Sequence, residues 1–305
     1  MVIKNRREYL FLYDVVNANP NGDPLEENKP RIDEETSKVL VTDVRLKRVI
    51  RDALEEELGE CVFYSKRKAQ SEDGKVKTRK ELLKEFGNDP KKAIEDCIDL
   101  RLFGATFSVE KNTLSLTGPV QFNFGISLHR VEPKLIKGTT VVASGEGKQQ
   151  GTFTEMWIIP YGLIAFHGVA NQFAAEDTGL SDEDLEKMTH AMWLGTKGST
   201  TVLSHSKMGH NPRLLIEIVY KNCVKTQIGE LDRLVKIETN KEEEAIRDIE
   251  ELKIDLSPLR KKLERYKDRI EKILYALDDR VVLAQPLEEI FNCIPMEEFP
   301  WLKEV

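Results

Sequence analysis

The alternation of apolar and polar positions predicts three elements in the first half of the chain. Residues 8–16 are a run of aromatic and β-branched side chains, which is typical of a buried strand. Thr42 then stands as an N-cap before a helix that Gly59 ends, with an apolar stripe made of Leu46, Val49, Ile50, Ala53, Leu54 and Leu58. From residue 120 onward apolar side chains alternate on one strand face, namely Val120, Phe122, Phe124, Ile126 and Leu128.

Three further elements are predicted between residues 156 and 221. Residues 156–170 and 213–221 are predicted strands, and between them Ser181 and Asp184 resemble a capping box ahead of a helix. The resulting order is strand, helix, strand, strand, helix, strand, which is the βαββαβ pattern of ferredoxin-like and RNA-recognition-motif folds. We therefore expect an α+β protein built around a ferredoxin-like palm.

Two insertions and a C-terminal extension surround this pattern. Residues 65–92 carry ten Lys or Arg against five Asp or Glu, so we expect an insertion that adds nothing to the core. Residues 131–155 are rich in Gly, Lys and Thr and are expected to form a long hairpin tip. In the last third, Ser257 begins a predicted helix whose apolar stripe runs from Leu259 to Leu277.

Composition excludes several classes of protein. The net charge of −7 argues against a uniformly basic nucleic-acid binder, although it leaves room for local patches of cations. No apolar run reaches the ~18 residues that a membrane span needs, and the N-terminal run lacks a signal-peptide cleavage pattern. We therefore expect a cytoplasmic protein with no membrane partner. Because no Cys-x-x-Cys pair occurs, we expect no zinc knuckle and no disulfide framework but four reduced structural thiols, at Cys61, Cys97, Cys223 and Cys293.

Cations gather in the first predicted helix. Lys47 and Arg51 lie four residues apart on one flank, while Arg45 and Arg48 lie on the other. Residues 29–51 as a whole hold seven cations against four acids. Cations one helical turn apart can follow adjacent phosphates of a nucleic acid without sequence preference. The alternative is an ordinary solvated helix face.

The loop after the first predicted strand is a second candidate. Residues 17–36 are dense in turn formers and include Asn19, Asn21 and Arg31. A loop of this length is uncommon unless it binds something. Its carboxylates have no recognisable metal-ligand spacing, so we expect no metal.

Two later segments are also polar. The hairpin tip contains Gly-Glu-Gly but lacks the Lys-Ser/Thr and the helix of a phosphate-binding loop. An exposed aromatic residue such as Phe153 could insert between stacked bases, and a flexible hairpin is the alternative. Residues 197–213 hold three cations, including Lys207, and no acid, which suits a polyanion or a plain loop. Ser206 and His210 suggest a hydrolase, but no G-x-S-x-G elbow is present.

Several blocks between residues 7 and 221 are specific when taken together. The first is the strand-loop-helix FLYDVVNANPNGDPLEENKPRIDEETSKVLVTDVRLKRVIRDAL, and the later ones are DLRLFGAT, TGPVQFNFGISLHRVE, GTFTEMWIIPYGLIAFHG, TGLSDEDLE and NPRLLIEIVY. In these blocks the chain resembles the CRISPR-associated seventh Cas protein family, most closely its type I-B (Csh-type) backbone subunit. Residues after 222 are less diagnostic.

The resemblance implies an architecture and a role. Residues 1–221 would form a hand-shaped RNA-recognition-motif palm, with a finger insertion at about 59–115, a thumb hairpin at about 131–155, and helices of the extension 222–305 packed on the palm. Copies would polymerise along the CRISPR RNA in a Cascade complex, with the large subunit and proteins of the fifth and sixth Cas families. The guide would be presented for pairing with target DNA in antiviral defence, without catalysis, cofactor or metal.

The resemblance also implies roles for individual residues. Lys47 of the LKR element takes the guide-phosphate position, with Arg51 as its partner one turn later. The thumb tip would fold over the guide and displace one nucleotide, with Phe153 or Met156 as the wedge. The complete expected RNA-binding set is Lys47, Arg51, Arg48, Arg45, Arg31, Asn19, Asn21, Lys207, Phe153 and Met156.

Two enzymatic hypotheses remain beside this one. Type III relatives cut target RNA with an aspartate ahead of the same helix, and Asp33 lies in a similar stretch here. A metal-dependent ribonuclease that uses Asp33 is therefore the alternative function, although the blocks match type I best and we expect no nuclease. A small-molecule hydrolase around Ser206 and His210 is the third hypothesis.

Overall fold

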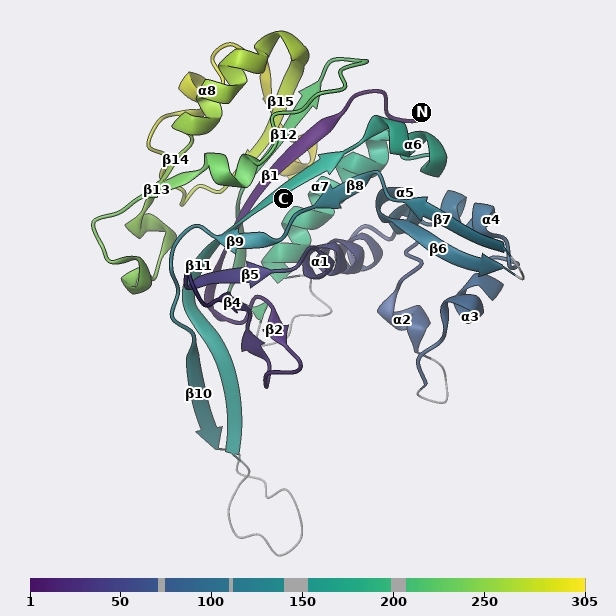
Figure 1. Cartoon of the computed structure of the whole chain (residues 1–305), viewed down its shortest axis with the longest axis horizontal. Helices are drawn as coiled ribbons and strands as arrows, with labels where there is room; N and C mark the ends of the chain where they lie inside the picture. Colours follow the sequence, from purple (N-terminus) through teal and green to yellow (C-terminus); the bar gives the residue numbers. More distant parts are fainter. Residues whose placement is uncertain (71–74, 110–111, 140–152, 199–206, 305) are drawn as a thin grey trace, which may run out of the picture.

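A ten-stranded sheet runs through the molecule (Figure 1). The structure is a computed structural model that describes residues 1–70, 75–109, 112–139, 153–198 and 207–304. β1 (Arg7–Ala18) lies at the centre, antiparallel to β11 (Phe153–Ala170) on one side and to β12 (His210–Tyr220) on the other. Beyond β12 follow β15 (Ile270–Leu277) and β16 (Met296–Glu298); beyond β11 follow β9 (Gly125–Ser127), β5 (Lys38–Val41) and β4 (Ile32–Asp33). β8 (Val120–Phe122) and β10 (Lys134–Thr139) also pair with β11.

Two long helices, α1 (Asp43–Glu56) and α7 (Asp182–Gly198), pack against one face of this sheet. Thr42 Oγ1 accepts a hydrogen bond from Arg45 N at 3.3 Å, and Ser181 Oγ accepts one from Asp184 N at 3.2 Å. Both predicted N-caps are therefore confirmed, because each satisfies a backbone amide that the first helical turn leaves free.

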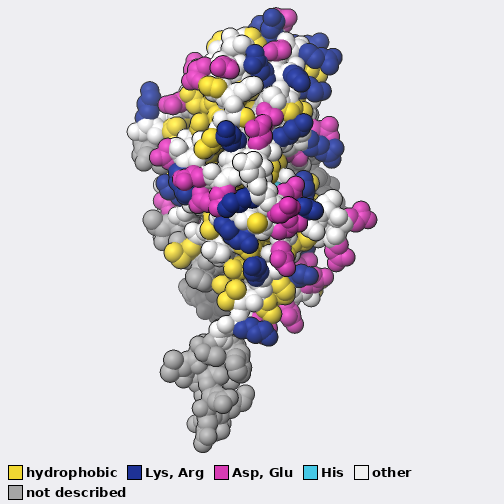
Figure 2. Space-filling view, turned by 90° about the vertical axis from the view of Figure 1, so that its left-hand side faces the viewer, with side chains coloured by type: hydrophobic (Ala, Val, Ile, Leu, Met, Phe, Trp, Pro, Cys, Tyr) yellow, Lys and Arg dark blue, Asp and Glu magenta, His cyan; other side chains and the backbone are white. Residues whose placement is uncertain are grey.

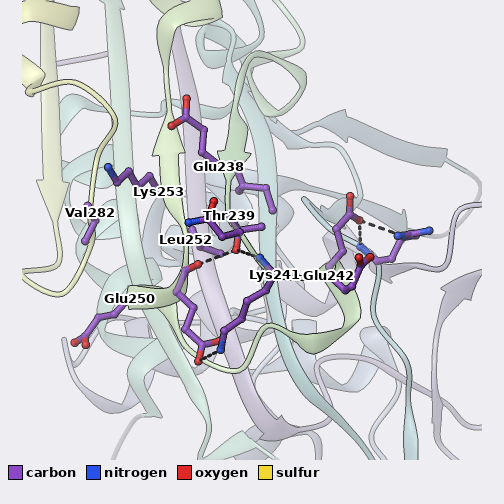
Figure 3. A pocket seen from close by; sticks show the side chains of 13 residues that line it. Glu238, Thr239, Lys241, Glu242, Glu250, Leu252, Lys253 and Val282 are labelled. Carbon is purple, nitrogen blue, oxygen red and sulfur yellow. Dashed lines mark hydrogen bonds and ion pairs between the residues drawn. The ribbon is translucent and has the colours of Figure 1, made fainter.

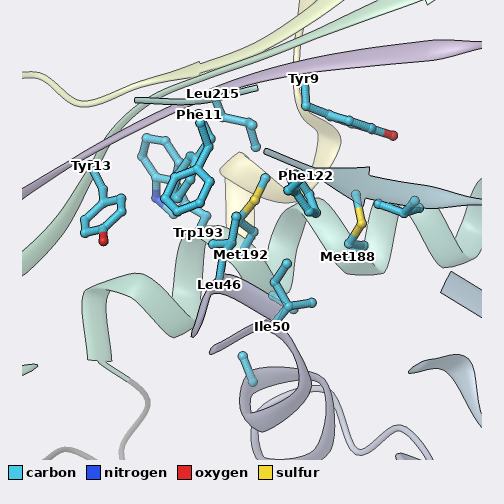
Figure 4. Packing of buried hydrophobic residues seen from close by; sticks show 14 of the residues in the cluster. Tyr9, Phe11, Tyr13, Leu46, Ile50, Phe122, Met188, Met192, Trp193 and Leu215 are labelled. Atoms are coloured by element: carbon cyan, nitrogen blue, oxygen red, sulfur yellow. The ribbon is translucent and has the colours of Figure 1, made fainter. Parts of the chain in front are cut away.

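The first hydrophobic core fills the space between these helices and the sheet (Figure 4). Phe11 and Leu215 point from the strands toward Met192 of α7 and toward Leu46 and Ile50 of α1. All five residues are 3% exposed or less. Burying a side chain of this size contributes roughly 1.5–3 kcal/mol. The apolar stripe of α1 is therefore what fixes this helix to the sheet.

A second core lies on the opposite face of the same sheet. Successive residues of a strand point to opposite faces, so Leu10 and Leu12 face this core while Phe11 faces the first. The C-terminal segment covers it with the 3-10 turn η2 (Leu231–Leu234) and helices α8 (Ser257–Tyr266) and α9 (Leu287–Ile290). Coverage on both faces explains why β1 is buried at most of its positions.

The C-terminal extension differs from the expected set of packed helices. The predicted helix ends at Tyr266, and the residues that follow form β15, where Tyr275 pairs with Ile216 of β12. The prediction of a helix up to Leu277 was wrong, because residues 273–277 are apolar without a break and alternate between the second core and the first. This is the pattern of a strand that is covered on both faces. Without β15 the backbone groups along the outer edge of β12 would lack hydrogen-bond partners. Pairing with this edge therefore favours a strand over the helix that the local pattern predicts.

The second predicted strand is interrupted. β8 and β9 are separated at Asn123, whose Oδ1 accepts a hydrogen bond from His167 N at 2.8 Å. Phe124 is 54% exposed whereas Val120 and Phe122 are buried, so the prediction that these residues share one strand face was wrong. At Gly125 a Cβ would lie 2.2 Å from the Phe166 ring, and glycine is therefore what lets the chain resume its path along β11.

The segment that we call the projecting unit, residues 61–117, stands beside the main sheet (Figure 1). Its elements are α2 (Lys66–Ala69), α3 (Arg79–Lys84), α4 (Pro90–Asp96), α5 (Ile98–Phe103) and the hairpin of β6 (Gly104–Val109) and β7 (Asn112–Thr117). It has a hydrophobic core of its own, made of Phe63, Leu82, Leu83, Phe86, Ala93, Ile94, Cys97, Leu100 and Phe107. The expectation that residues 65–92 add nothing to a core was wrong, because α3 and the turn after it contribute Leu82, Leu83 and Phe86.

β10 and β11 form a ladder that reaches away from the sheet (Figure 1). The rest of the predicted hairpin tip, residues 140–152, lies outside the described residues. The remaining elements are β2 (Gly22–Asp23), β3 (Lys29–Pro30), α6 (Gln172–Thr178), β13 (Lys236–Glu238), β14 (Lys253–Asp255) and the 3-10 turns η3 (Glu243–Ala245), η4 (Ile249–Glu251), η5 (Lys267–Arg269) and η6 (Pro300–Glu304). Within the described ranges, no helix combines the length and the apolar character that crossing a membrane requires.

Candidate nucleic-acid interface

A pocket of about 390 Å³ opens where four separate segments of the chain meet. It is lined by Asn19, Asn21, Gly22, Glu27, Asn28, Arg45, Glu155, Met156, Trp157 and Lys207. Half of the residues predicted to bind RNA are among them, namely Asn19, Asn21, Arg45, Met156 and Lys207. Asn19 and Lys207 are 188 positions apart in the sequence. The tertiary structure therefore brings together residues that the sequence could name only one segment at a time.

The loop after β1 is held in place by its own side chains. Asn19 Nδ2 donates to Asn28 O at 2.6 Å, which closes the loop across the β2–β3 hairpin. Asn21 Oδ1 accepts a hydrogen bond from Thr42 N at 2.9 Å and a second from Thr42 Oγ1 at 2.9 Å. Asn21 thus joins the loop to the first turn of α1. These bonds fix one wall of the pocket next to Arg45.

Asn19 leaves one polar atom of this wall without a partner. The residue is 6% exposed, and its Oδ1 has no hydrogen-bond partner among the residues that the structure describes. Buried polar atoms are normally hydrogen-bonded. The free acceptor therefore suits a donor from a bound molecule, such as a ribose hydroxyl group.

Two cations line this pocket without a carboxylate partner in the described part of the chain. Lys207 Nζ donates to the carbonyl oxygens of Asn19 and Pro20, the latter at 3.1 Å. Burial, together with the nearby charge of Arg45, lowers the pKa of Lys207 to about 7. Burial also lowers the pKa of Arg45. Two like charges with little water around them favour the binding of an anion, which would stabilise both charged forms.

Two other cations of α1 are held by partners within the protein. Lys47 Nζ lies 3.1 Å from Asp43 Oδ2 and 3.1 Å from Gln121 Oε1. Arg48 pairs with Asp52 one turn further along the helix. An RNA phosphate at either position would have to share or replace these partners, so the RNA-binding role of Lys47 and Arg48 stays a prediction.

Arg51 ties α1 to the projecting unit. Its Nε lies 3.0 Å from Asp99 Oδ2, and its guanidinium carbon lies 4.9 Å from the centre of the Phe103 ring. Asp99 is fully buried and also accepts a hydrogen bond from Phe63 N at 2.7 Å. The helical spacing that marked Arg51 as a phosphate ligand gave no sign of this partner. Its role in RNA binding also stays a prediction.

The other expected residues lie around the pocket. Arg31 pairs with Asp23 at 2.5 Å, and its Nε is buried without a hydrogen-bond partner among the described residues. Met156 of β11 lies opposite Ile136 and lines the pocket. Phe153 begins β11, but its side chain lies outside the described residues.

Sequence reasoning missed two residues here. Trp157 lines the pocket, and Lys29 Nζ lies 5.7 Å from the centre of its ring. The available signal was the tryptophan next to Met156 in the block GTFTEMWII. Lys29 was counted among the cations of residues 29–51 but was given no role. Proteins that bind single strands commonly stack a base on an aromatic ring while cations nearby contact the phosphates. A cation over the ring adds a cation–π contact.

The residues named in the two enzymatic hypotheses are Asp33, Ser206 and His210, and none of them lines this pocket in the described part of the chain. Asp33 Oδ2 accepts a hydrogen bond from Thr36 Oγ1 at 2.6 Å, so this carboxylate closes the turn between β4 and β5. His210 is buried, and this burial, with Lys207 nearby, holds its pKa well below the usual value. Ser206 lies outside the described residues. In the described ranges, no group of three or more His, Cys, Asp and Glu side chains is arranged to hold a metal ion.

A second pocket, of about 720 Å³, lies beside β13 and β14 (Figure 3). Two of its cations are paired with lining acids, Lys241 with Glu251 at 2.6 Å and Arg130 with Glu243 at 3.5 Å. The lining as a whole holds five Glu against three Lys or Arg. Cations and acids are also interspersed on the face of the molecule in Figure 2. The pocket with Arg45 and Lys207 is therefore the stronger candidate for a polyanion.

Comparisons with known proteins agree on one family. The family model of CRISPR-associated protein Cas7 matches residues 5–257. A "CRISPR-associated protein Cas7" of Haloferax volcanii is 33% identical over 315 aligned positions, which cover 93% of this chain and 90% of the relative.

Solved structures show the same fold at low sequence identity. A chain of a "CRISPR RNA-guided surveillance complex, pre-nicking" has a TM-score of 0.60 at 13% identity, with 98% of each chain covered. A chain of a "CRISPR RNA-guided surveillance complex" has a TM-score of 0.56 at 14% identity, with 96% of this chain and 94% of that one covered. By its family match and its relative, the protein belongs to the CRISPR-associated protein Cas7 family.

Proposed function

We propose that this protein is a non-catalytic backbone subunit that binds CRISPR RNA in a type I-B Cascade complex. Copies of the chain oligomerise along the guide, which is presented to target DNA for pairing in antiviral defence. Membership of the Cas7 family supports this role. Its partners are the guide RNA, further copies of itself, the large subunit, and proteins of the fifth and sixth Cas families.

The architecture is consistent with a ferredoxin-like palm of the RNA-recognition-motif type. The elements β1, α1, β8 with β9, β11, α7 and β12 occur in βαββαβ order, and the sheet places them as β12-β1-β11-β9. In this proposal residues 1–221 are the palm, about 59–115 the finger and about 131–155 the thumb. Residues 222–305 extend the palm, because β15 continues its sheet.

The observation that carries the proposal is the pair of cations, Arg45 and Lys207, in the pocket under the β10–β11 ladder. A phosphate placed between them would accept a bidentate contact from the guanidinium and a point charge from the ammonium group. The free Asn19 Oδ1 and the Trp157 ring supply contacts for a ribose and a base. None of these contacts reads a base edge, which suits a guide whose sequence must remain available for pairing.

The test is RNA binding by a variant that lacks both pocket cations. Arg45→Gln with Lys207→Gln should bind single-stranded RNA ~10–100-fold more weakly, because two charge-assisted contacts are lost. The slope of log affinity against log salt should become shallower by about 0.7, the value for one phosphate contact on a single strand. Fluorescence polarisation with a labelled RNA over a salt series measures both quantities.

The matched control removes the same two charges elsewhere. Lys261 and Arg265 are exposed on α8, far along the chain from the pocket, and Lys261→Gln with Arg265→Gln should bind RNA like the wild type. Thermal melts check that each variant is folded. Equal losses in the two double variants would point to a general charge effect and contradict the pocket, as would wild-type affinity of the pocket variant.

A further inference from the structure

Two of the four cysteines meet inside the projecting unit. The Sγ atoms of Cys61 and Cys97 are 2.8 Å apart, and both thiols are free. Cys97 is fully buried between α4 and α5, whereas Cys61, on the segment that follows α1, is partly exposed. A disulfide bond is about 2.05 Å long. The two sulfur atoms therefore lie close to bonding distance, with only one of them accessible to a reagent.

The backbone on both sides of the thiols is already fixed. Ile98 N donates to Cys61 O at 3.0 Å, directly beside the two sulfur atoms. Two residues further along, Asp99 Oδ1 accepts a hydrogen bond from Phe63 N at 2.7 Å, and Asp99 Oδ2 accepts one from Tyr64 N at 3.2 Å. These three bonds hold the segments side by side. A bond between the thiols thus requires little movement of the backbone.

The surroundings make the two thiols unequal. Lys68 Nζ lies 3.5 Å from Cys61 Sγ and also donates to Val62 O at 3.0 Å, so it stays next to this thiol. The hydrogen bond from Cys97 and the charge of Lys68 lower the pKa of Cys61. The same hydrogen bond and burial raise the pKa of Cys97. A partly exposed thiol beside a cation is the arrangement of a reactive cysteine, and a buried thiol next to it can act as the resolving partner.

We propose that Cys61 and Cys97 are an oxidisable dithiol, in which Cys61 reacts with a small-molecule disulfide and Cys97 resolves the product. The Cys61 thiolate attacks one sulfur of the reagent, which forms a mixed disulfide and releases one thiolate. Cys97 then gives up its proton to solvent and attacks Cys61 Sγ, which forms the internal disulfide and expels the second thiolate. Two protein thiols are oxidised, and the reagent is reduced to two thiols.

The bond would lock the base of the projecting unit. It would enclose the chain from Cys61 to Cys97, which contains α2, α3 and α4. Asp99, two residues beyond Cys97, is the partner of Arg51 in α1. A crosslink here restricts the unfolded chain, so oxidation should raise the melting temperature by about 5 °C.

The first experiment uses the wild-type full-length protein. The reduced protein is incubated with oxidised glutathione, and its free thiols are titrated and its peptides mapped without reduction. We expect the thiol count to fall from four per chain to two, with a single crosslink between Cys61 and Cys97. A stable glutathione adduct on Cys61 with Cys97 still free would overturn the proposal. So would oxidation confined to the exposed Cys223 and Cys293.

Variants test the order of the two steps. Cys97→Ser should trap one glutathione on Cys61, whereas Cys61→Ser should leave Cys97 unmodified. Lys68→Met should slow alkylation of Cys61 near neutral pH, and Lys68→Arg should restore the rate. Cys223→Ser with Cys293→Ser is the matched control and should form the crosslink at the wild-type rate. Modification of Cys97 in the Cys61→Ser variant would contradict the assigned order.

Discussion

Single cations divide into those that pair with a carboxylate inside the protein and those that have no such partner among the described residues. Arg51 and Lys47 have partners at about 3 Å, whereas Arg45 and Lys207 line a pocket without carboxylate partners among the described residues. The sequence shows only that each residue is a cation. Whether a cation binds a ligand depends on what the fold places opposite it.

We expect that replacing Arg51 mainly lowers the stability of the folded protein. Arg51→Ala should lower the free energy of unfolding by about 2–4 kcal/mol, because Asp99 is fully buried and would lose its charged partner. Urea denaturation measures this loss, and Arg265→Ala on the exposed face of α8 is the control, with a change within about 0.5 kcal/mol. A stable Arg51→Ala protein that binds RNA weakly would instead make Arg51 a direct ligand.

Lys207 should make RNA binding depend on pH. The pKa of Lys207 is lowered to about 7 in the free protein, so this side chain loses its proton as the pH rises through neutrality. A bound phosphate favours the charged form, so RNA affinity should fall between pH 6 and pH 8. Binding should take up a proton near pH 8, where the free side chain is neutral, and none near pH 6, where it is already charged. Polarisation titrations at constant ionic strength measure the effect.

The control for this pH dependence is Lys207→Gln. That variant should bind RNA more weakly, and its affinity should change little over the same pH range. His210 should contribute little to this pH dependence, because burial holds its pKa well below the usual value in the folded protein. If Lys207→Gln keeps the wild-type pH profile, the titrating group is not Lys207.

At the scale of elements, the C-terminal segment contacts the rest of the protein in two separate places. β15 completes the edge of β12, while the last residues return to the other face and pack against α7. There Trp301 Nε1 donates to Thr189 Oγ1 at 3.2 Å, and the Trp301 ring stacks on Phe299 with centres 5.0 Å apart. The segment thus touches both hydrophobic cores.

Trp301→Ala should therefore destabilise the whole protein. The residue is 3% exposed, and removing a buried indole from a core costs about 3–5 kcal/mol. Trp301→Phe should cost less, because it keeps an aromatic ring for the stacking and loses only the hydrogen bond and part of the buried ring. Lys303→Ala, at an exposed position of the same 3-10 turn, is the control. Thermal melts measure the three variants, and a wild-type melting temperature for Trp301→Ala would contradict this role of the segment.

For the whole molecule, one sheet joins strands of the first 220 residues to β15 and β16 of the C-terminal segment. Arg213 of β12 pairs with Asp14 of β1 at 2.9 Å and with Asp278 after β15 at 2.5 Å. These ion pairs cross three neighbouring strands, and the hydrophobic cores on the two faces share the same strands. Residues 222–305 therefore add strands to the sheet that β1 and β11 belong to, whereas the sequence analysis expected only helices packed on it.

The structure also bears on how a protein with a net charge of −7 could bind a polyanion. Most cations on α1 and around the second pocket are neutralised by nearby acids. Among the described residues, Arg45 and Lys207 have no carboxylate within ion-pair distance, and Glu155 of the same pocket pairs with Lys137 instead. Affinity for a polyanion depends on such local charge more than on the total.

The sequence alone determined the elements whose own residues carry the signal: the buried β1, the caps and stripe of α1, the capping box of α7 and the turn-rich loop. These follow from short-range periodicity and from capping by neighbouring residues. The tertiary structure decided the strand β15, the core of the projecting unit and the partners of each cation. These features depend on an open sheet edge or on a residue tens of positions away. Short-range sequence patterns contain no information about either.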